Sequence, residues 1–121
     1  MGKLCDDTVL DGLLDIVNNA DEQYLCVGEP ASRAAADSTS VIPAATPTFS
    51  SFANGDTNGR KVTVQANNGL TADATGTVDH VALCIASGTV LLYVTTCTSQ
   101  AVTSGNTVNI GAWDVEVADP T

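Results

Sequence analysis

The chain has 121 residues and a formal net charge of −10 at pH 7, with 14 acidic residues, 4 basic residues and one His. This length allows one folded domain with a sizeable core but leaves no room for a second domain. Such an acidic surface repels nucleic-acid phosphates and anionic lipids, which excludes both as expected partners.

The start of the chain, Met1 to Asp7, turns acidic at once and has no apolar signal-peptide core. The longest apolar runs, such as Val90 to Val94, are far shorter than the roughly 20 residues that cross a bilayer. We therefore expect a protein that is made and folded in the cytoplasm and does not cross a membrane.

Residues 6–19 follow the periodicity of an amphipathic helix. Apolar side chains fall on one face and acids on the other, namely Val9, Leu10, Leu13, Leu14, Ile16 and Val17 against Asp7, Asp11 and Asp15. Asp6 or Asp7 is a suitable N-cap, because a carboxylate can accept hydrogen bonds from the free amides of the first turn. Gly12 costs about 1 kcal/mol of helix propensity relative to Ala, so we expect packing to hold the helix.

The next segments are less regular. Tyr24 to Val27 predicts a short strand, and Ala31 to Asp37 predicts either a loop or one helical turn. Residues 38–57 are rich in Ser, Thr, Ala and Pro. Because proline offers no amide to a strand ladder, this composition predicts an edge strand or an extended arm, which Phe49 and Phe52 would anchor.

Residues 60–117 predict the β core. Residues 60–66 and 70–74 alternate between apolar and polar side chains, and the Asn-Asn-Gly between them predicts a tight turn and a hairpin. In residues 107–117 the apolar parity changes around Gly111 and Ala112, which indicates a β-bulge in the last strand.

A second hairpin joins Val78–Ala86 to Thr89–Thr96 through a two-residue turn at Ser87 and Gly88. This turn predicts the opposed pairs Ile85 and Val90, Cys84 and Leu91, Leu83 and Leu92, and Val81 and Val94. The small side chains Ala82, Cys84 and Ala86 leave room on one face for the N-terminal helix or a second sheet. The expected fold is therefore mainly β: a single-domain antiparallel β-sandwich or barrel-like sheet with one N-terminal amphipathic helix.

The four cysteines, Cys5, Cys26, Cys84 and Cys97, have no Cys-x-x-Cys spacing, and the one His gives little support as a further metal ligand. A reducing cytosol keeps thiols free. The pattern favours buried free thiols over two disulfides, and a metal site least of all.

Catalytic signatures are lacking. His80 is the only side chain whose ordinary pKa suits acid–base chemistry near neutrality. Its neighbour Asp79 is expected on the opposite face of the strand, so we expect a structural His and no catalytic pair. No Ser has a Gly-x-Ser-x-Gly setting. We expect no enzyme, no catalytic residue and no cofactor.

Two further motifs have simpler interpretations. Asn54 to Gly59 resembles the start of a calcium loop, but it begins with Asn, and Gln65 stands where a bidentate Glu belongs. A polar turn is therefore favoured over a metal site. Trp113 alternates with Val115 and Val117, which favours a core position over a binding surface.

The chain resembles small proteins encoded in the structural gene regions of tailed bacteriophages and prophages. The resemblance runs nearly end to end, through segments 6–14, 25–30, 59–64, 75–83, 91–96 and, most specifically, 100–120. It implies a virion structural protein, either a capsid decoration (cement) protein or a neck or tail accessory. An acidic β module with an extended arm favours decoration. A tail-tip module that binds a receptor or carbohydrate is the rival, although aromatic residues are only 4% of the chain.

The expected partners of a decoration protein are the major capsid protein and further copies of the chain, for example as a trimer. We expect the arm between Ser38 and Phe52 to make the apolar contacts and acids on the helix to meet basic capsid patches. The predicted partner-binding residues are Val41, Ile42, Phe49, Phe52, Asp11 and Asp15.

Overall fold

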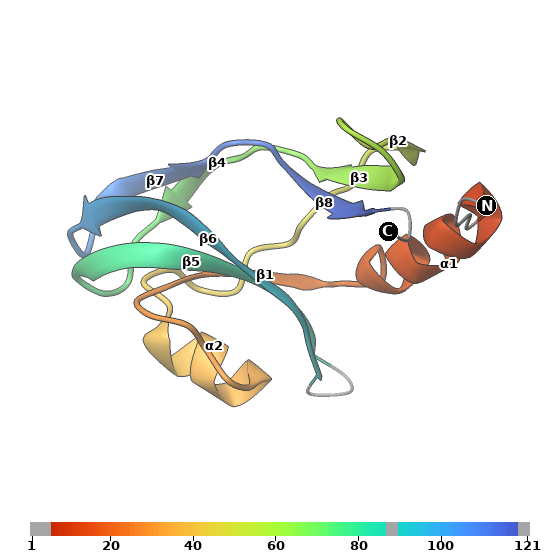
Figure 1. Ribbon diagram of the computed structural model, residues 1–121. Helices are drawn as coiled ribbons and strands as arrows, with labels where there is room; N and C mark the ends of the chain where they lie inside the picture. Colours follow the sequence, from red (N-terminus) through yellow and green to blue (C-terminus); the bar gives the residue numbers. More distant parts are fainter. Residues whose placement is uncertain (1–5, 87–89, 119–121) are drawn as a thin grey trace.

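Two layers of antiparallel strands form the body of the protein (Figure 1). The computed structural model describes residues 6–86 and 90–118. Within these ranges the elements are α1 (Asp7–Val17), β1 (Glu22–Cys26), α2 (Arg33–Thr39), β2 (Ala53–Asn54), β3 (Arg60–Val64), β4 (Asn67–Thr71), β5 (Gly76–Ile85), β6 (Val90–Val102), β7 (Thr107–Ile110) and β8 (Trp113–Val117). One layer has the order β1-β5-β6, and the other contains β2-β3-β8 and β4-β7. The predicted mainly β, sandwich-like fold with an N-terminal helix is confirmed.

The second layer is one long, bent ribbon, although its halves belong to separate sheets. Val64 on β3 stands opposite Trp113 on β8, and Asn67 on β4 stands opposite Ile110 on β7 in the same register. β3 therefore continues into β4, and β7 continues into β8. The parity change at residues 111–112 marks a break between two strands, whereas a bulge was predicted.

The predicted hairpin between residues 60–66 and 70–74 is wrong. β3 pairs with β2 and β8, while β4 pairs with β7. Gly69 lies inside β4 with a φ of 75°, at a register shift in the β4–β7 pairing. The Asn-Gly pair was predicted to form a turn because glycine adopts a positive φ easily. In the structure the positive φ of Gly69 instead allows the irregular pairing within β4.

The β5–β6 hairpin is present, and its register is confirmed nearest the turn. Ile85 stands opposite Val90, and Cys84 stands opposite Leu91. The register then shifts, which places Leu83 opposite Tyr93 and Val81 opposite Thr95. The pairs predicted beyond Cys84 are therefore wrong by one residue. The predicted turn at residues 87–88 lies outside the described residues.

Both helices begin at a capping side chain. Asp6 accepts a hydrogen bond from the amide of Thr8 at 2.8 Å, which confirms the predicted N-cap of α1. Residues 31–37, for which the sequence predicts either a loop or one helical turn, lie mostly in α2. The N-cap of α2 is Ser32, whose hydroxyl accepts a hydrogen bond from the amide of Ala35 at 3.1 Å. α2 packs on the β1-β5-β6 sheet, where its buried Ala36 joins Cys84 in one core cluster. The small side chains Ala82 and Cys84 of β5 therefore pack against α2. The sequence predicted the N-terminal helix or a second sheet at this face.

Residues 40–49 are part of the core and not a detached arm. Isolated bridges join Ser40 and Ala45 to β1, and Phe49 to β3. Val41 and Ile42 are 1% and 2% exposed, because they fill the space between the two layers. Proline has no amide to donate to a continuous strand ladder, but this segment forms only isolated bridges, so its prolines are tolerated. The segment connects the edge of β1 to β3 and so closes one side of the sandwich.

Candidate functional site

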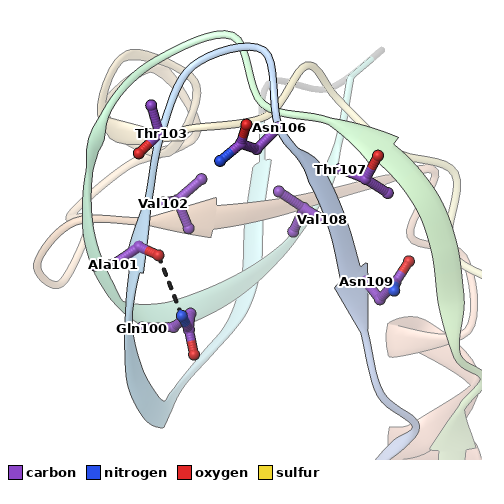
Figure 2. Close-up of a pocket in the computed structure, with 8 residues that line it drawn as sticks. All are labelled: Gln100, Ala101, Val102, Thr103, Asn106, Thr107, Val108 and Asn109. Carbon is purple, nitrogen blue, oxygen red and sulfur yellow. Dashed lines mark hydrogen bonds between the residues drawn. The ribbon is translucent and has the colours of Figure 1, made fainter.

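The other side of the sandwich is open. In the described residues β6 pairs only with β5, β7 only with β4, and β8 only with β3. Each of these strands therefore has one edge without a strand partner. A groove of about 380 Å³ lies between the end of β6 and β7, lined by residues 100–103 and 106–109 (Figure 2). We call it the β6–β7 groove.

The floor of the β6–β7 groove is apolar. Figure 2 shows the side chains of Val102 and Val108 pointing into the space between the strands. The groove shares lining residues with an adjoining hollow of about 310 Å³ that reaches Leu25 and Ile110. A further hollow of about 160 Å³ extends to Trp113. Leu25, Val102, Val108 and Ile110 are all core residues, so the opening leads directly to the core.

The rim of the groove is uncharged and polar. Gln100, Asn106 and Asn109 supply amides, and Thr103 and Thr107 supply hydroxyls. The groove offers no carboxylate, imidazole or thiol at this end. Its chemistry therefore suits binding of an uncharged polypeptide surface more than a reaction.

α1 presents a second candidate surface. Leu10 and Leu14 are buried, but Val9, Leu13 and Ile16 are 56%, 50% and 55% exposed. The three exposed residues follow the i, i+4, i+7 spacing of one helical stripe. We call them the α1 ridge. The fold thus covers only half of the predicted apolar helix face.

Every Lys or Arg in the described part of the chain is engaged in an ion pair. Arg33 contacts Glu22 at 2.8 Å, and Arg60 contacts Asp11 at 2.8 Å. Lys61 lies 2.7 Å from Asp56 and 3.2 Å from Asp114. The outer surface of residues 6–86 and 90–118 is therefore acidic, with no cation left to bind an anionic partner.

The Glu22 network is the most buried of these pairs. Arg33 donates to both carboxylate oxygens of Glu22, at 2.9 and 2.8 Å, and the Tyr24 hydroxyl donates to Glu22 Oε2 at 3.0 Å. The hydrogen bonds from Arg33 lower the pKa of Glu22. Burial, and then the neighbouring Glu22, raise the pKa of Tyr24 to about 12. The network anchors α2 to β1.

His80 and Asp79 are in contact, which corrects their predicted placement on opposite faces. His80 Nδ1 lies 2.8 Å from Asp79 Oδ1, where the β5–β6 register shifts and strict alternation is lost. Asp79 also accepts from the amide of Gly28 at 2.8 Å. The hydrogen bond from His80, followed by that from Gly28, lowers the pKa of Asp79.

His80, together with Glu29 and Thr96, lines a hollow of about 270 Å³. Within the described residues, no hydroxyl or thiol is hydrogen bonded to His80. An acid–base pair needs such a contact to activate a nucleophile. The geometry instead ties the loop after β1 to β5.

Residues 54–59 form a tight turn, in which the amide of Gly55 donates to the carbonyl of Gly59 at 2.9 Å. Asp56, Asp114 and Glu116 offer carboxylate oxygens within 4.8 Å of one another, the one such group among the described residues. The ammonium of Lys61 already contacts Asp56 and Asp114, so the chain itself offsets one of the three negative charges of the cluster.

The structure separates the predicted partner-binding residues. Val41 and Ile42 are in the core, which corrects their assignment as surface contacts. Phe49 and Phe52 are half-buried against the cluster under α1. Asp11 is bound to Arg60, so Asp15 alone of the six is exposed. The α1 ridge was not predicted, because an apolar helix face ordinarily indicates a core contact. The β6–β7 groove was not predicted either, because no local sequence pattern marks the place where two strands fail to pair.

The described cysteines are free. Cys26 and Cys84 are buried, as the sequence predicts, whereas Cys97 is half-buried. Burial raises the pKa of all three thiols, that of Cys84 to about 11. Cys5 lies outside the described residues. Trp113 stacks on Tyr93 with ring centroids 6.0 Å apart and contacts two core clusters.

No protein-family model, curated protein or solved structure matches the chain. Neither helix in the described residues combines the length and apolar character needed to span a membrane.

Proposed function

We propose that this chain is a bacteriophage virion structural protein that decorates the capsid by docking on the major capsid protein. The end-to-end resemblance to phage structural proteins supports virion membership. The observation that carries the docking role is the α1 ridge, three large aliphatic side chains held outward beside the packed stripe of Leu10 and Leu14.

The ridge has the geometry of a helix that lies in a groove of a partner. Full burial of one such side chain contributes about 1.5–3 kcal/mol, so three of them supply a useful anchor at each of many symmetric sites. The exposed Asp15 and the other unpaired acids favour a partner whose apolar groove has a basic rim. A second copy of the chain has no free cation in its described residues to meet them.

The alternatives have less support. A carbohydrate-binding tail-tip module commonly presents exposed aromatic rings, but Tyr24 is buried and the other described aromatics are at least half-buried. Covalent catalysis needs a base in contact with a nucleophile, and the His80–Asp79 pair has none among the described residues. A neck or tail position uses the same docking surface and differs in copy number.

The test is binding of the purified chain to capsids that lack it, by co-sedimentation. The double variant Leu13→Gln/Ile16→Gln removes two of the three apolar side chains of the α1 ridge but keeps good helix formers. We expect it to fold normally and to lose at least about tenfold in affinity, or about 1.4 kcal/mol. The control Val27→Thr changes a side chain that is 44% exposed away from α1 and should bind normally. Equal binding by the double variant would reject the docking role.

A further inference from the structure

The charges of this protein are distributed very unevenly. From Val81 through Trp113 the chain contains no Asp, Glu, Lys or Arg, and all of its charged residues lie before or after this stretch. The described part of the stretch includes the end of β5, all of β6 and β7, and the start of β8. Of these strands, β6 and β7 border the β6–β7 groove. The part of the open side that β6 and β7 form is thus an uncharged face on a strongly acidic molecule, whereas β8 carries Asp114 and Glu116.

We infer that this uncharged face is where a second copy of the chain docks, with the β6–β7 groove at the centre of the contact. Two copies that each carry a net charge of −10 repel one another wherever their acidic surfaces meet. Screening at physiological salt acts over about 8 Å, so acids in direct contact still repel. Contact through the uncharged face avoids that repulsion.

The backbone supports the same contact. The groove-side edges of β6 and β7 have no strand partner in the described residues, so their amides and carbonyls are available to another chain. Charged side chains and prolines commonly keep edge strands apart, and β6 has neither. The register shifts in its pairing with β5 are the one feature of β6 that hinders pairing with another chain. Core residues such as Val102 and Val108 would also lose their remaining exposure to water.

A dimer contact needs only a modest share of the molecular surface. A standard interface buries about 800 Å² on each partner. That is about an eighth of the 6518 Å² of accessible surface. The uncharged stretch makes up more than a quarter of the chain, and most of β6 is exposed or half-exposed.

The experiment is sedimentation velocity of the full chain over a concentration series, without capsids. We expect a species of about twice the 12.3 kDa chain mass. The double variant Thr98→Glu/Gln100→Glu places one carboxylate on the groove and one on the adjoining hollow of each copy, and should be monomeric. Gln100→Glu alone is nearly isosteric and should weaken the dimer at least fivefold without affecting the fold, as checked by circular dichroism.

The control Ala34→Glu adds the same charge to the exposed surface of α2, on the far side of the β1-β5-β6 sheet (Figure 1), and should remain dimeric. A wild-type protein that is monomeric throughout, or an oligomer that withstands both groove variants, would overturn the inference. The inference does not rest on the proposed virion function, because the measurement needs no capsid.

Discussion

Arg60 on β3 holds Asp11 on α1 through two hydrogen bonds, from Nε to Oδ1 at 2.8 Å and from Nη2 to Oδ2 at 3.2 Å. Its remaining nitrogen, Nη1, donates to Asn54 Oδ1 at 2.9 Å. The two-point contact fixes how α1 rotates on the sheet, with Leu14 directed to the core and the α1 ridge directed outward. One acid of the predicted binding face therefore orients the helix.

Replacing Arg60 should loosen α1. Lys keeps the charge but cannot make the forked contact, so we expect the melting temperature to fall in the order wild type, Arg60→Lys, Arg60→Ala. Because the pair is partly exposed, the differences should shrink at high salt. Hydrogen exchange of the α1 amides is the direct measurement. Unchanged protection in Arg60→Ala would show that the pair does not hold the helix.

Two adjacent leucines on α1 should differ sharply. Leu14 is fully buried, so Leu14→Ala should cost about 2–5 kcal/mol of unfolding free energy. Leu13 is 50% exposed, so Leu13→Ala should change stability by no more than about 0.5 kcal/mol. Urea unfolding of both variants measures the difference. Similar losses would mean that α1 packs differently.

The segment at residues 40–49 should be essential for folding. Ile42 is 2% exposed in the cluster between the layers, so Ile42→Ala should cost about 2–5 kcal/mol. Deletion of residues 38–50 should abolish cooperative unfolding, because it opens the side of the sandwich that this segment closes. A deletion variant with a normal unfolding transition would contradict the closed arrangement.

The Glu22–Arg33 pair predicts a loss of stability in acid. The hydrogen bonds from Arg33 lower the folded-state pKa of Glu22 below its ordinary value of 4.5. The ionised carboxylate therefore stabilises the fold above about pH 4.5, and this contribution disappears as the pH falls through the lowered pKa. Glu22→Gln should be less stable at neutral pH and should lose less on acidification. Parallel stability–pH curves for the two proteins would exclude this contribution.

Cys26 and Cys84 should be unreactive in the native protein. Burial raises both pKa values, that of Cys84 to about 11, so little thiolate forms at mildly alkaline pH. Alkylation followed by peptide mass spectrometry should find both unlabelled until the protein is denatured. Rapid native labelling of either thiol, or a disulfide between them, would contradict the buried free state.

Local patterns in the sequence predicted the elements better than their partners. The helix at residues 6–19, its Asp6 cap and the β5–β6 pairing at Ile85 and Val90 follow from periodicity, capping and turn chemistry. The pairing of β3 with β8 and of β4 with β7 does not. Asn-Gly looks like a turn, and only the tertiary pairing with β7 makes it an irregularity within a strand.

The candidate surfaces were harder to predict for a related reason. Periodicity identifies an apolar helix face but not how much of it the sheet covers, so Leu13 and Leu14 cannot be distinguished from the pattern alone. The Pro-rich composition of residues 38–57 indicated a free arm, whereas Val41 and Ile42 supply core volume. The β6–β7 groove arises where two strands of different sheets do not pair, and no local signal marks that.

The most direct test of the proposed function is the copy number of this protein in purified phage particles, by quantitative mass spectrometry against the major capsid protein. Capsid decoration predicts hundreds of copies per particle, in a simple ratio to the capsid subunits. A handful of copies would contradict decoration and indicate the neck or tail. Complete absence from the particles would contradict virion membership itself.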